Sequence, residues 1–158
     1  MRPLGDGAKA PDFTLEGSTE EPVTLSKVLQ GTPFVVLAFF PAAFSSVCTD
    51  ELNVLQETHD EFQRLGARLI AISVDGKWTQ RAFAEQNGIT FPVLSDFHPK
   101  GAVAQKYGVM REDGTAERAL FIIDSDRVAR YSFVSEPAKN PGVDRLLERL
   151  EELQAERK

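Results

Sequence analysis

The sequence predicts an α/β fold in which helices cover both faces of a central, mixed β-sheet. Residues 34–40 form an uninterrupted apolar run of β-branched and aromatic side chains, which is typical of a strand buried on both faces. Helix and strand patterns then alternate along the chain, and this order requires parallel strands with right-handed crossovers. Strand patterns at 119–124 and 128–133 flank a short turn at 125–127 and therefore predict an antiparallel hairpin.

The elements before the buried run are short. Residues 10–15 have the pattern of an extended arm or edge strand, where proline is tolerated, and residues 23–25 are placed to pair with them. Ser26 is expected to cap a short helical turn that ends before Gly31. Pro41 ends the buried strand.

Helices and further strands follow the buried run. Apolar side chains recur at helical spacing from Leu52 to Leu65, and the glycine that follows is typical of a helix C-terminus. Together with the elements that follow along the chain, this order is that of the thioredoxin fold. A length of 158 residues suits a single domain, which we place over residues 1–158. The remaining patterns predict, in order, a strand at 68–74, a helix at 78–87, an extended segment at 91–96, a helix at 102–107, the hairpin, and a last helix lined by Val143, Leu146, Leu147 and Leu150.

Composition argues against several classes of protein. A formal net charge of −6, with no cluster of Lys or Arg, argues against nucleic-acid binding. The apolar segments are too short to cross a membrane, and the first residues lack the apolar core of a secretory signal. One cysteine does not suit a disulfide-built secreted domain. We therefore expect a cytoplasmic protein that binds neither membrane nor nucleic acid.

Cys48 is the single cysteine, and its position favours a reactive thiol. It follows the buried strand after a short loop and opens the next helix, where α/β folds place ligands and where backbone amides stabilise an anion such as a thiolate. We expect a nearby Arg or Lys to add to this stabilisation. Ser45 stands where a Cys-x-x-Cys pair has its second thiol, so dithiol exchange within the chain is excluded. The competing interpretation makes Cys48 a small buried apolar residue and Ser45 a capping hydroxyl.

Around Cys48 the sequence resembles the peroxiredoxin family. The segment from Pro41 to Cys48 reads PAAFSSVC and fits the family's motif P-x-x-x-T/S-x-x-C, with serine at position 45 where threonine is commoner. Further matches occur in order along nearly the whole chain: APDF at 10–13, FPVLSD at 91–96 and RALFIID at 118–124. The single cysteine and residues 95–103 are most similar to the one-Cys alkyl hydroperoxide reductase E subgroup.

The resemblance implies a role for each matched residue. Cys48 would be the peroxidatic thiolate, which attacks a peroxide oxygen and becomes a sulfenic acid. Arg118 would stabilise this thiolate and hold the peroxide. Ser45 would hydrogen-bond the peroxide, and Pro41 would shield the thiolate. Supporting roles fall to the backbone amides of Val47 and Cys48, to an apolar rim that includes Phe44, and to Glu51, which would orient Arg118.

Alternatives stay open for some of these residues. Arg118 is alternatively a surface residue at a strand end, paired with Glu112 or Glu117, and Glu51 is alternatively a solvated carboxylate of the first helical turn. The two histidines and one cysteine lack the spacing of a metal site. The resemblance requires no metal, flavin or haem cofactor.

Because the chain has no second thiol, the resemblance implies that another molecule completes the cycle. Either a low-molecular-weight thiol with a glutaredoxin-like protein, or thioredoxin itself, would reduce the sulfenic acid. Hydrogen peroxide, organic hydroperoxides and peroxynitrite are all candidate substrates, and a homodimer is the family expectation. Two other functions compete: a peroxide sensor or redox relay, which also needs a reactive Cys48, and a holdase or scaffold in which the cysteine is incidental.

Overall fold

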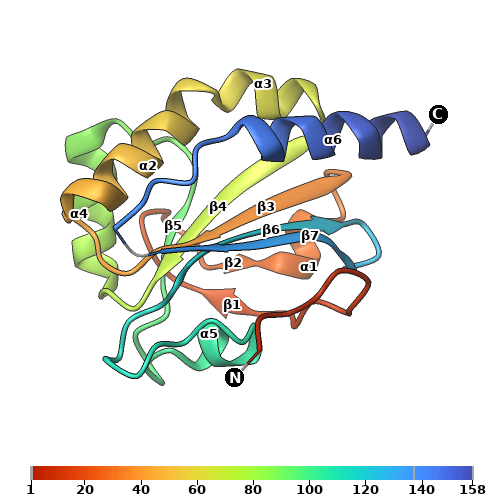
Figure 1. Cartoon of the computed structure of the whole chain (residues 1–158). Helices are drawn as coiled ribbons and strands as arrows, with labels where there is room; N and C mark the ends of the chain where they lie inside the picture. Colours follow the sequence, from red (N-terminus) through yellow and green to blue (C-terminus); the bar gives the residue numbers. More distant parts are fainter. Residues whose placement is uncertain (1, 137, 158) are drawn as a thin grey trace.

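The structure is a computed structural model that describes residues 2–136 and 138–157, and it confirms the predicted α/β class (Figure 1). A five-stranded sheet has the order β5-β4-β3-β6-β7. Strands β3, β4 and β5 run parallel, and β6 and β7 run antiparallel to their neighbours, so the sheet is mixed. The strands are β3 (Phe34–Phe39), β4 (Ala67–Ser73), β5 (Val93–Ser95), β6 (Arg118–Asp124) and β7 (Ala129–Ser135).

Helices cover both faces of this sheet, as in the thioredoxin fold (Figure 1). All six residues of β3 are buried, because alternate side chains enter the apolar cores on opposite faces. One face carries α2 (Ser46–Glu57), α3 (His59–Arg64), α4 (Lys77–Asn87) and α6 (Asp144–Glu156), and the other carries α1 (Leu25–Val28) and α5 (Ala102–Lys106).

The N-terminal segment differs in detail from the prediction. Only Thr14–Leu15 (β1) of the expected arm is a strand, and it pairs antiparallel with β2 (Val23–Thr24). The expected cap at Ser26 is wrong, because the helix begins at Leu25 and Ser26 lies inside it. Both the amide and the hydroxyl of Ser26 donate to Asp12, at 2.9 and 2.8 Å, so this serine ties α1 to the N-terminal segment.

The helix expected up to Leu65 is interrupted. Thr58, with φ −100° and ψ 11°, separates α2 from α3. Its hydroxyl donates to the carbonyl oxygen of Val54 at 2.8 Å, and such a side-chain bond to the preceding turn bends helices. The last helix reaches Glu156, beyond the predicted apolar positions. Within the described residues, no helix combines the length and apolar character needed to span a membrane.

Candidate functional site

Cys48 lies beyond the carboxyl end of the central strand β3, in the first turn of α2. It is the third residue of the helix, and the N-cap residue Ser45 accepts a hydrogen bond from the Cys48 backbone amide at 3.3 Å. The Cys48 amide, one of the two expected supporting donors, thus donates to Ser45 in this structure. The Cys48 side chain is 0% exposed and packs in the apolar core between the sheet and α2.

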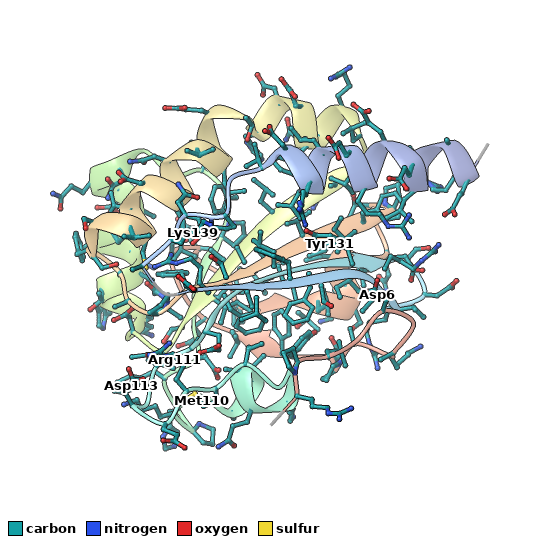
Figure 2. The ribbon with its side chains drawn as sticks, viewed as in Figure 1. Asp6, Met110, Arg111, Asp113, Tyr131 and Lys139 are labelled. Carbon is teal, nitrogen blue, oxygen red and sulfur yellow. The ribbon has the colours of Figure 1, made fainter. Side chains whose placement is uncertain are left out.

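A buried arginine contacts the thiol. Arg118 opens β6, the antiparallel neighbour of β3, and its Nη2 donates to Cys48 Sγ at 3.2 Å. The Arg118 side chain is 2% exposed, so the interpretation of a surface arginine is wrong. Glu117, one of the two partners considered in that interpretation, pairs instead with Arg111 at 3.2 Å. Figure 2 shows Arg111 in the loop before β6. The fold thus places a buried cation against the only thiol.

Glu51 shares this cation with Cys48. Its Oε1 accepts from Arg118 Nη1 at 2.7 Å, and the side chain is 3% exposed, so the alternative of a solvated carboxylate is wrong. Its Oε2 has no hydrogen-bond partner among the described residues. Burial raises the pKa of Glu51 to about 7, against the opposing effect of Arg118. The Cys48 sulfur and the Glu51 carboxyl group therefore contact the same buried guanidinium, one through each of its two terminal nitrogens.

The loop between β3 and α2 forms the outer side of the site. Pro41 and Val47 are half-buried, while Phe44 is 47% exposed and sets its ring edge against Phe83 of α4, with the centroids 5.2 Å apart. Phe44 has a positive φ of 68°, which is uncommon for a residue other than glycine. The backbone amide of Ala43 donates to a carboxylate outside the motif, Asp75, which the sequence analysis missed.

This arrangement suits thiolate chemistry. Helix N-terminal dipoles and a guanidinium both stabilise a sulfur anion, and the apolar surroundings exclude competing water. Residues 7–132 match the profile described as the AhpC/TSA family. The chain belongs to this peroxiredoxin family.

Relatives of this peroxiredoxin include an alkyl hydroperoxide reductase E and 2-Cys peroxiredoxins. Alkyl hydroperoxide reductase E of Mycobacterium tuberculosis is 42% identical over 137 residues, covering 86% of this chain and 89% of the relative. The chloroplastic 2-cysteine peroxiredoxin of Chattonella marina var. antiqua is 34% identical over 158 residues, covering 94% of this chain and 80% of the relative. The resemblance to the peroxiredoxin family is thereby confirmed, and with it membership of a family of antioxidant peroxidases.

Solved structures agree with this assignment. Peroxidoxin BcpB from Mycobacterium tuberculosis has a TM-score of 0.84 at 32% identity, covering 95% of this chain and 98% of its own. The reduced 2-Cys peroxiredoxin of Plasmodium vivax has a TM-score of 0.89 at 26% identity, covering 98% of this chain and 84% of its own. This peroxiredoxin therefore shares its thioredoxin-like fold with a peroxidoxin and with a 2-Cys peroxiredoxin.

Two histidines of the peroxiredoxin lie outside this cluster. His59 is half-buried on α3, with its ring 6.2 Å from that of Phe91, as expected for a partly buried histidine. His98 lines a surface cavity together with Trp78 and Phe97, and neither Cys48 nor its contacts line that cavity. Among the residues that the structure describes, no three His, Cys, Asp or Glu side chains form a metal-binding group.

The shifted Glu51 predicts a pH-dependent stability. Its pKa of about 7 in the folded protein exceeds its ordinary value of 4.5, so folding stability should fall as pH rises through this window. The loss across the window is about 3 kcal/mol, at about 1.4 kcal/mol per pKa unit. Glu51→Gln keeps an oxygen for Arg118 but does not titrate, so we expect it to flatten the profile. Urea unfolding at a series of pH values measures this.

The matched control for this prediction is Glu117→Gln. Glu117 is also paired with an arginine but is half-exposed, so this variant should keep the wild-type slope of unfolding free energy against pH. A Glu51→Gln variant with the same slope as the wild type would contradict the prediction.

Proposed function

We propose that this peroxiredoxin is a one-Cys thiol peroxidase that reduces peroxides through Cys48 and is recycled by an external thiol. The observation that carries the proposal is the 3.2 Å contact between Arg118 Nη2 and Cys48 Sγ, both of which belong to buried side chains. A structural cysteine needs no charged partner, and burying the Arg118–Glu51 ion pair beside it carries a desolvation cost that apolar side chains would avoid. The absence of a second cysteine supports the external reductant.

In the proposed reaction, the Cys48 thiolate attacks the terminal oxygen of a hydroperoxide. The S–O bond forms as the O–O bond breaks, the sulfur is oxidised to a sulfenic acid, and the leaving alkoxide or hydroxide takes a proton to become an alcohol or water. Arg118 stabilises the negative charge as it moves from sulfur to the leaving oxygen. Ser45 accepts from the Cys48 amide and keeps its own hydroxyl proton for a peroxide oxygen.

The loop between β3 and α2, which forms the apolar rim of the site, is compatible with peroxides of different size. Phe44 is 47% exposed beside the helix that carries Cys48, and Pro41 lies half-buried at the start of the same loop. We assign hydrogen peroxide, organic hydroperoxides and peroxynitrite as substrates, with the Phe44 ring providing an apolar contact for the organic group.

Recycling would proceed through a mixed disulfide. A thiol condenses with the Cys48 sulfenic acid and releases water, and a second thiol then frees the Cys48 thiolate. The reductant is a low-molecular-weight thiol acting with a glutaredoxin-like protein, or thioredoxin.

Mass spectrometry tests this recycling directly. Protein treated with one equivalent of peroxide is mixed separately with glutathione, mycothiol, bacillithiol and reduced thioredoxin. We expect one adduct on Cys48 with the physiological reductant, fast return to the reduced mass in excess reductant, and no adduct in Cys48→Ser. A persistent mixed disulfide with slow turnover would instead favour the sensor or relay, and a protein that never forms an adduct would contradict both.

A further inference from the structure

The loop that precedes the reactive helix is strained and must be held in place. Phe44 has a φ of 68°, a backbone conformation that persists in a bulky residue only where its surroundings enforce it. The next residue, Ser45, is the N-cap of α2 and accepts from the Cys48 amide. The conformation at Phe44 therefore decides where α2 begins and where the Cys48 sulfur lies.

Two contacts hold this strained residue. On one side its ring packs edge-on against Phe83 of α4, with 5.2 Å between the centroids. On the other side the backbone amide of the preceding residue, Ala43, donates to Asp75 Oδ2 at 2.8 Å. Asp75 follows β4, which pairs in parallel with β3, so its carboxylate reaches the loop from the neighbouring strand end.

A buried network fixes the Asp75 carboxylate. Ser73 Oγ donates to the same Oδ2 at 2.6 Å, and Gln80 Nε2 donates to Ser73 Oγ at 2.8 Å. The Gln80 amide also donates to the carbonyl oxygen of Leu94 at 2.7 Å. Ser73 and Gln80 are both 0% exposed. The loop is thus tied, through Asp75, to three elements of the rigid core: β4, α4 and β5.

This network has a cost in folding stability, which indicates that its polar side chains do more than fill space in the core. Gln80 Oε1 is buried and has no hydrogen-bond partner among the described residues. An unpaired buried carbonyl oxygen destabilises a fold, and an apolar side chain of similar size would avoid the loss. What the glutamine supplies at this position is the donor that orients Ser73 and hence Asp75.

We propose that Asp75 is a positioning residue for the peroxidase reaction, whose carboxylate holds the Ala43 amide so that the loop keeps Cys48 aligned with Arg118. The inference rests on the proposed function, because it concerns the rate of the same oxidation step. It adds a residue that lies outside the cysteine motif and touches neither the sulfur nor Arg118 through any contact described above.

Asp75→Ala tests the inference. Losing a charge-assisted acceptor should free the loop and slow the oxidation of Cys48 by hydrogen peroxide by about ten- to hundredfold. The same release should expose the buried sulfur, so alkylation of Cys48 by iodoacetamide should become faster. Asp75→Asn keeps an oxygen for the Ala43 amide and should recover most of the oxidation rate, which a loss of general stability would not explain.

The matched control is Asp12→Ala. Asp12 also accepts from a backbone amide and a serine hydroxyl, both of Ser26, but it ties down α1 on the other face of the sheet. This variant should lower the urea midpoint and leave both Cys48 rates unchanged. Should Asp75→Ala fail to fold, Ser73→Ala removes only the hydroxyl that orients the carboxylate, and a smaller decrease in oxidation rate is expected.

The outcomes separate this inference from the proposed function. If the wild type oxidises rapidly but Asp75→Ala, or Ser73→Ala in its place, keeps the wild-type oxidation rate, Asp75 has no positioning role and the proposed function stands. If wild-type Cys48 reacts with hydrogen peroxide no faster than free cysteine, the proposed function itself fails.

Discussion

Replacing Cys48 by serine is expected to abolish peroxide reduction. A serine hydroxyl stays protonated near neutral pH and has no accessible oxidation state equivalent to a sulfenic acid, so neither half of the cycle can occur. The substitution exchanges sulfur for oxygen at a site that is 0% exposed, and the new hydroxyl keeps Arg118 within reach, so the fold should persist. Peroxide consumption with an excess of reductant should fall to the rate measured without protein.

The controls for this prediction separate lost chemistry from lost structure. The circular dichroism spectrum and urea midpoint should show that Cys48→Ser is folded, and Ser46→Ala, an exposed change in the same helical turn, should keep the wild-type rate. Peroxidase activity that survives in folded Cys48→Ser would show that the cysteine is incidental.

Arg118→Ala is expected to slow the oxidation of Cys48 by about 100-fold or more, the magnitude typical of removing one preorganised electrostatic contact. The guanidinium donates to both Cys48 and Glu51. Its loss therefore removes the cation at the sulfur and leaves the buried Glu51 carboxylate without its ion-pair partner. Arg118→Lys should give an intermediate oxidation rate. It keeps a positive charge, but a single ammonium group cannot reproduce the two guanidinium nitrogens that contact Cys48 and Glu51. Rapid mixing with hydrogen peroxide measures each rate.

Stability is again the control. If the unpaired, buried Glu51 carboxylate unfolds Arg118→Ala, the double variant Arg118→Ala with Glu51→Gln removes that charge. The double variant should fold and should still show slow oxidation of Cys48. Arg111→Ala and Glu117→Ala break a neighbouring surface ion pair and should keep the wild-type rate. Equal small effects at Arg118 and Arg111 would remove Arg118 from the site.

The elements that sequence predicted well are those whose signal is local. The apolar run at 34–40 identified the central strand because a strand buried on both faces must be apolar throughout. The helix expected at 78–87 is α4, whose C-cap Gly88 has a φ of 64°, a conformation that glycine adopts without strain. The motif around Cys48 and the resemblance at Arg118 named two residues 70 positions apart that the structure brings into contact.

The features that sequence did not predict depend on tertiary contacts. The role of Ser26 follows from its bonds to Asp12 in the N-terminal segment. The break at Thr58 is the exception, because its side-chain bond to Val54 is local, but a threonine at this spacing also fits a regular helix. The burial of Glu51 follows from Arg118 on a distant strand. Asp75 carried one signal that could have been used: it directly follows a buried strand, at the sheet edge where the reactive loop also begins.

The most direct test of the central claim is the second-order rate constant for the first oxidation of reduced wild-type protein, followed by quenching and mass analysis of Cys48. If Cys48 is a peroxidatic thiolate held beside Arg118, hydrogen peroxide should convert it to the sulfenic acid several orders of magnitude faster than it oxidises free cysteine, with one oxygen added per chain. A rate equal to that of free cysteine at the same pH would contradict the account.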